Sequence, residues 1–75
     1  MIGLTPSMEQ RARAFAARMI AEGLDEIDVT DDEFPGRGRG FKVVRASRLD
    51  AIVFACRIEV GGTPFFVGLA RPRGM

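Results

Sequence analysis

The chain lacks the residues from which most enzymes build an active site. Its 75 residues include no histidine, tryptophan or tyrosine, and only one cysteine. Without a histidine, no serine or cysteine can be activated through a Ser/His or Cys/His mechanism, and a hydrolase would depend on carboxylates alone. We therefore expect that the protein is not an enzyme and that it uses no cofactor.

The acidic residues form no recognisable metal-binding or catalytic pattern. Asp28, Asp31 and Asp32 lie close together in the sequence. An EF-hand loop requires oxygen ligands at regular positions, a central glycine and a distal glutamate, and this pattern is absent. Nor does the sequence show an apolar pocket that would keep Asp31 or Asp32 protonated for acid catalysis. We expect these acids to be solvated and to bind no metal.

The single cysteine and the lack of long apolar runs bear on location. Cys56 has no partner for an internal disulfide, which fits a reducing compartment. No apolar run approaches the roughly 18 residues of a membrane span, and the N-terminus has no basic segment followed by an apolar one. We expect a cytoplasmic protein without a membrane partner, folded as one small domain over residues 1–75.

The charge of the chain is divided along its length. Residues 1–33 contain three basic and eight acidic residues, a net charge of −5, whereas residues 34–75 contain eight basic and two acidic residues, a net charge of +6. Such a division either provides two surfaces for two partners or makes the two halves complementary to each other.

The first third of the chain is typical of an amphipathic helix at about residues 6–22. Either Thr5–Pro6 or a capping box from Ser7 to Gln10 can start it, and Gly23 can end it. Apolar residues recur at spacings of three and four: Met8, Ala12, Phe15, Ala16, Met19 and Ile20. We expect this stripe to pack against a sheet.

The remainder predicts an antiparallel meander. Residues 24–34 form an acidic connection or a short edge strand at 26–30, with one helical turn before Pro35, and residues 35–40 form a Gly/Arg loop. Strands are expected at 41–46, 51–60 and 64–70, before a basic tail at 71–75. The fold class is therefore α+β, one helix on three or four strands.

A two-residue turn at Gly61–Gly62 sets the expected register. The predicted opposing pairs are Val60–Thr63, Ile58–Phe65, Cys56–Val67 and Phe54–Leu69. The face toward the helix would then contain Ile52, Phe54, Cys56, Ile58, Val60, Phe65, Val67 and Leu69, together with Phe41 and Val43.

The opposite face of this sheet is apolar although no second helix is expected to cover it. It would contain Val44, Ala46, Val53, Ala55, Phe66, Gly68 and Ala70. Such a patch, rimmed by charge, is typical of an interface. The alternative explanations are that residues 24–34 fold across it or that Phe66 stacks on Arg57 in water. The predicted partner-binding residues are Phe66, Arg57, Val44 and Val53, with the acids Asp28, Asp31 and Asp32.

Two classes of function follow. The first is a non-enzymatic modulator or inhibitor that occupies the surface of a protein partner, and by analogy of size alone the small anti-CRISPR inhibitors of mobile elements are of this kind. The alternative is a nucleic-acid-binding accessory protein that contacts phosphates through Arg37, Arg39, Lys42, Arg71 and Arg73. A homodimer closed through the open sheet face is compatible with either.

Overall fold

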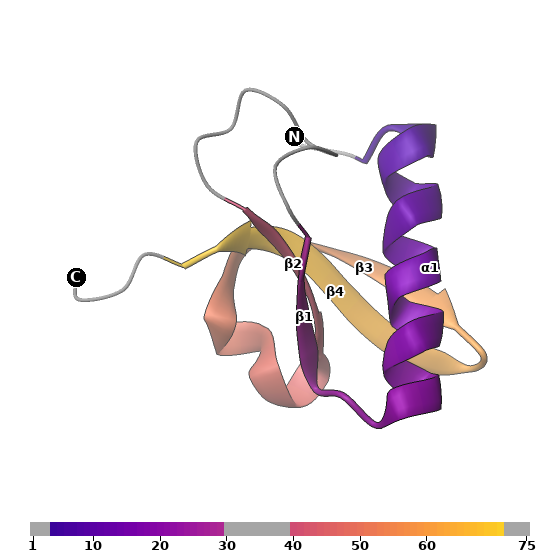
Figure 1. Ribbon diagram of the computed structural model, residues 1–75. Helices are drawn as coiled ribbons and strands as arrows, with labels where there is room; N and C mark the ends of the chain where they lie inside the picture. Colours follow the sequence, from indigo (N-terminus) through magenta and orange to yellow (C-terminus); the bar gives the residue numbers. More distant parts are fainter. Residues whose placement is uncertain (1–3, 30–39, 72–75) are drawn as a thin grey trace.

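One helix packs on one face of a four-stranded antiparallel sheet, which confirms the α+β fold class (Figure 1). The computed structural model describes residues 4–29 and 40–71. Its elements, in chain order, are α1 (Pro6–Glu22), β1 (Glu26–Val29), β2 (Phe41–Arg45), the 3-10 helix η2 (Ala46–Ala51), β3 (Ile52–Val60) and β4 (Thr63–Ala70). None of the helices in these ranges has the length and apolar character needed to cross a membrane.

The bounds of α1 are those that the sequence predicts, and its first residue is set by Thr5. The Thr5 side chain accepts a hydrogen bond from the backbone N–H of Met8 (3.1 Å), and Pro6 occupies the first helical position. Of the two predicted starts, Thr5–Pro6 is therefore correct, and Ser7 lies inside the helix. The helix ends at Gly23, whose positive φ of 71° reverses the chain.

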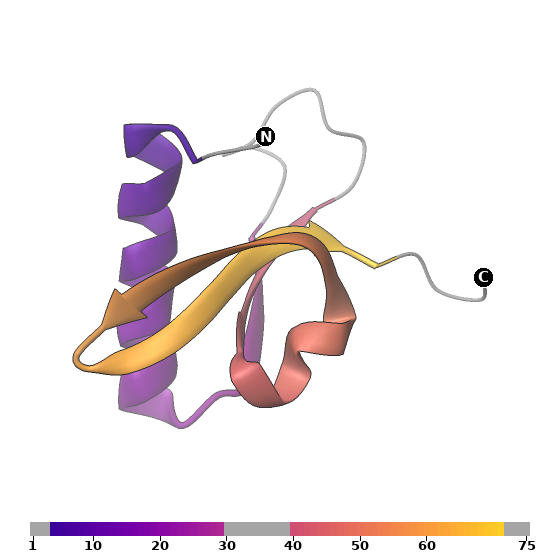
Figure 2. The ribbon, with the colours of Figure 1, turned by 180° about the vertical axis from the view of Figure 1, so that it is seen from behind.

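The strand order is β1-β2-β4-β3, so the predicted meander is wrong in one respect. The neighbour of β2 is β4, and β3 lies beyond it at the edge. Both β2 and β3 are antiparallel to β4, so they run parallel to each other. Parallel strands cannot be joined by a tight hairpin. Residues 47–50, which were expected to form a hairpin loop, instead belong to η2, which carries the chain across the sheet (Figure 2).

The predicted register holds near the hairpin turn and fails farther along β3. Gly61 and Gly62 both have positive φ, and the pairs Val60–Thr63, Ile58–Phe65 and Cys56–Val67 form as predicted. Beyond Cys56 the register shifts. Leu69 pairs with Val53 and not with Phe54.

The shift is a β-bulge in which Phe54 and Ala55 together oppose Gly68. Gly68 is required at this point, because a methyl group there would collide with the carbonyl oxygen of Val53 and would lie 3.2 Å from Cδ1 of Ile52. The bulge also exchanges the faces of the residues before it. Residues paired across a ladder share a face, so Ile52, which pairs with Ala70, lies on the face away from α1.

The main core lies between α1 and the inner face of the sheet. Its buried members are Ala12, Ala16, Met19, Val29, Phe41, Val43, Ile58, Phe65 and Val67. Three residues predicted for this face, Ile52, Phe54 and the half-buried Cys56, do not belong to this core. The side chain of Phe54 is on the surface, and Ile52 is buried on the opposite face.

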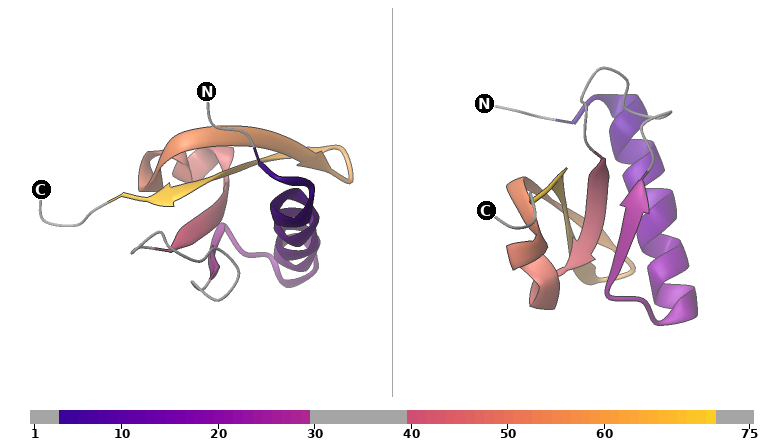
Figure 3. Two further views of the ribbon diagram at one scale, coloured as in Figure 1. Left: turned by 90° about the horizontal axis from the view of Figure 1, so that it is seen from above. Right: turned by 60° about the vertical axis from the view of Figure 1, so that its left-hand side comes forward.

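The outer face of the sheet is partly covered by η2, which the sequence did not predict to be helical. Figure 3 shows α1 and η2 on opposite sides of the sheet. Val44, Ile52 and Gly68 are buried on this outer face. At this end of the sheet the crossover from β2 to β3 covers the outer face, which is an explanation that the sequence did not indicate.

Candidate interaction surface

The bulge leaves Phe54 exposed in an unfavourable backbone conformation. Its side chain is 67% exposed, more than that of Ile20 or Leu49, the other large apolar side chains on the described surface. Its φ is +58°, in the left-handed region. For a residue with a Cβ this conformation costs about 1–2 kcal/mol. Neither core packing nor turn formation accounts for a phenylalanine here, because glycine would adopt the same φ without strain.

Arg57 follows Phe54 by three residues along β3, and Phe66 lies in the paired strand β4 of the same hairpin. They oppose each other across β3 and β4, on the face away from α1. Arg57 is exposed and contacts Oε2 of Glu59 (3.3 Å), whereas Phe66 is half-buried. Gly68, which opposes the bulge, is two residues from Phe66 along β4. We call Phe54, Arg57 and Phe66 together the β3 surface.

Two other residues predicted for partner binding do not lie on this surface. Val44 is completely buried on the outer face. Val53 is half-buried and pairs with Leu69, which packs against the main core, so the bulge places Val53 on the face toward α1. Of the four residues named for this face from the sequence, Arg57 and part of Phe66 remain accessible on it.

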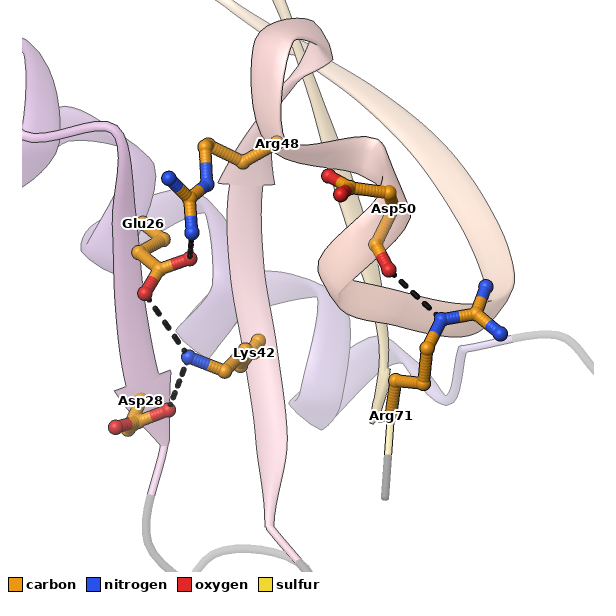
Figure 4. A network of polar contacts seen from close by, with 6 residues as sticks. All are labelled: Glu26, Asp28, Lys42, Arg48, Asp50 and Arg71. Carbon is orange, nitrogen blue, oxygen red and sulfur yellow. Dashed lines mark hydrogen bonds and ion pairs between the residues drawn. The ribbon is translucent and has the colours of Figure 1, made fainter. Parts of the chain in front are cut away.

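A network of charged side chains joins β1, β2 and η2 on the outer face (Figure 4). Nζ of Lys42 contacts Oδ1 of Asp28 (2.9 Å) and Oε2 of Glu26 (3.3 Å). Arg48 of η2 contacts the other carboxylate oxygen of Glu26 (3.4 Å). Burial lowers the pKa of Lys42, but hydrogen bonds and charge from Asp28 and Glu26 outweigh it, so that its pKa lies above 10.5.

These contacts give Asp28 and Lys42 structural partners within the chain. Asp28 keeps an exposed side chain, whereas the side chain of Lys42 is only 17% exposed. The other two predicted acids, Asp31 and Asp32, lie outside the described residues, as does the helical turn expected before Pro35.

The residues proposed for nucleic-acid binding are mostly outside the described ranges as well. Arg37, Arg39 and Arg73 belong to this group. Arg71 donates from Nε to the carbonyl oxygen of Asp50 (2.7 Å) and from Nη2 to that of Ile52 (3.3 Å). Its guanidinium therefore caps the end of η2. Together with Lys42, the described members of this set bond within the chain.

Metal-ligand geometry and comparison with known proteins assign no further functional residue among those that the structure describes. Within residues 4–29 and 40–71, no three His, Cys, Asp or Glu side chains are grouped as metal ligands. Cys56 is half-buried, opposite Val67. No protein-family model, curated protein or solved structure matches the chain.

Sequence reasoning missed Phe54 because strict alternation along β3 places it in the core. One signal of the bulge was present. A glycine inside a strand often marks a bulge or a close backbone approach, and Gly68 lies inside β4.

Proposed function

We propose that this chain is a non-enzymatic, cytoplasmic protein-binding module that acts by occupying a partner's surface through the β3 surface. The observation that carries the proposal is the exposure of Phe54. It is the most exposed large apolar side chain of the described residues, and it sits at positive φ in an edge strand. Strained backbone occurs preferentially where function requires a particular side-chain position.

The composition of the β3 surface supports a protein partner. Aromatic residues and arginine are enriched among the residues that contribute most to protein–protein affinity. Phe54 provides apolar area at the bulge, while Phe66 and Arg57 provide an aromatic and a cation on the adjoining outer face. Occupation of a partner's surface requires neither a nucleophile nor a metal ion.

The experiment is affinity capture from a cell lysate with three forms of the tagged protein, the wild type, Phe54→Gly and Leu49→Ala. Leu49 is the control because it is also a large exposed apolar residue, 39% exposed, but belongs to η2. Nuclease is added to half of each sample, and retained proteins are quantified by mass spectrometry.

We expect a protein that survives nuclease to be retained by the wild type and by Leu49→Ala, and to be lost with Phe54→Gly. Because glycine relieves the strain at position 54, we expect this variant to be folded, and circular dichroism checks that a loss of binding is not a loss of fold. Equal retention by Phe54→Gly would refute the role of Phe54. Recovery that disappears with nuclease would instead support nucleic-acid binding through the Gly/Arg loop and basic tail.

A further inference from the structure

Strand β3 has an outer edge that no strand among the described residues pairs with. It is the last strand in the order β1-β2-β4-β3 and is nine residues long. Such an edge presents backbone N–H and C=O groups that can pair with another chain, and natural proteins usually protect it.

The hairpin turn determines which backbone groups of β3 point outward. A two-residue turn makes Val60 and Thr63 a hydrogen-bonded pair. Alternate residues of β3 then bond to β4, and the backbone groups of Arg57 and Glu59 point away from the sheet. This assignment agrees with a contact from the helix, since Nη1 of Arg13 donates to the carbonyl oxygen of Glu59 (2.8 Å).

The other end of β3 shows the same arrangement. The N–H of Arg71 donates to the carbonyl oxygen of Ala51 (2.9 Å), which continues the ladder with β4 and leaves Ile52 pointing outward. The carbonyl oxygen of Ile52 accepts from Nη2 of Arg71 (3.3 Å). An arginine side chain therefore binds an outward carbonyl at each end of β3, and the bulge at Phe54 lies between them.

Both guanidinium groups are held in place by second contacts. Nη2 of Arg13 pairs with Oε2 of Glu9 at 3.0 Å, and Nε of Arg71 donates to the carbonyl oxygen of Asp50 at 2.7 Å. The guanidinium of Arg13 thus occupies the position from which an incoming strand would donate an N–H to the carbonyl oxygen of Glu59.

We propose that Arg13 blocks the edge of β3 near the hairpin turn from pairing with a second copy of this chain. The second copy is the expected occupant because the edge is self-complementary in charge. Arg57 and Glu59 are two residues apart on one face. In an antiparallel pair with its two-fold axis at Ile58, Arg57 of each copy would lie beside Glu59 of the other. This proposal does not depend on the function proposed above.

The test compares two matched helix variants, Arg13→Ala and Arg18→Ala. Each removes one arginine from an exposed ion pair with a glutamate one turn away, Glu9 for Arg13 and Glu22 for Arg18. Of these two arginines, Arg13 donates to β3, whereas Arg18 donates to Glu22 of its own helix. Molar mass is measured by sedimentation over a wide concentration range, and circular dichroism checks that each variant is folded.

We expect the wild type and Arg18→Ala to stay monomeric over the range measured. Arg13→Ala should form dimers at concentrations at least tenfold below the highest at which the wild type is still monomeric. The proposal is overturned if Arg13→Ala associates no more than Arg18→Ala, or if the wild type is already dimeric.

The register is tested in the Arg13→Ala background. The substitution Arg57→Glu would place two glutamates opposite each other, one from each copy, and should abolish the dimer. The double exchange, Arg57→Glu with Glu59→Arg, restores opposite charges across the pair and should restore the dimer. Dimerisation that is insensitive to Arg57→Glu would overturn pairing through the β3 edge.

Discussion

Replacing Phe54 with glycine is expected to stabilise the protein although it removes an aromatic side chain. The φ of +58° costs a residue with a Cβ about 1–2 kcal/mol. The greater freedom of glycine in the unfolded chain offsets about 0.5–1 kcal/mol of this gain. Little burial is lost, because the side chain is 67% exposed. The net increase in the free energy of unfolding should be about 0–1.5 kcal/mol.

The matched variant Phe54→Ala separates backbone strain from loss of the ring. Alanine removes the ring but keeps a Cβ at positive φ, so it should gain no stability. For a domain of this size the predicted gain of Phe54→Gly corresponds to a rise in Tm of up to about 12 °C. Thermal and urea unfolding of the three proteins provide the measurement. If Phe54→Gly is no more stable than Phe54→Ala, position 54 is not strained and the main support for the proposed function is lost.

Three further substitutions test the fold. Gly68→Ala should lower the free energy of unfolding by about 1–3 kcal/mol, because its methyl group collides with the carbonyl oxygen of Val53. The free energy is measured by urea unfolding, and a value equal to that of the wild type would contradict the bulge geometry. Thr5→Ala should lower the free energy of unfolding by about 1 kcal/mol, because it removes the acceptor for the N–H of Met8. Thermal unfolding measures this loss, and an unchanged Tm would contradict the cap. Because the pKa of Lys42 is raised in the folded protein, its charged form contributes to the free energy of unfolding. This contribution is complete below pH 10.5 and is lost as the pH rises through the folded-state pKa. Urea unfolding across this range should therefore show a steeper loss of stability for the wild type than for Lys42→Met, and parallel curves would refute it.

The sequence predicts the parts of the fold that are set by neighbouring residues. Pro6 and Gly23 delimit α1, and the two glycines of the β3–β4 turn fix the pairs from Val60–Thr63 to Cys56–Val67. These features depend on backbone conformations that particular residue types favour.

The strand order and the bulge depend on contacts between distant residues, and local patterns do not predict them. Residues 47–50 are compatible with a hairpin loop as well as with η2, and only the insertion of β4 beside β2 decides between them. The position of Phe54 then follows from the close approach of Val53 to Gly68. An error of one residue in register changes the face of every residue before it, which is why Ile52, Val53 and Phe54 were all misplaced.

The most direct measurement of the central claim is photo-crosslinking from position 54. A photoreactive phenylalanine analogue is introduced at Phe54 in one form of the protein and at Ala17, an exposed position on α1, in another, and both are irradiated in cells that make the protein. The proposed function predicts a covalent adduct of discrete mass that contains a second protein and forms from position 54 only. No adduct, or the same adducts from both positions, would contradict it.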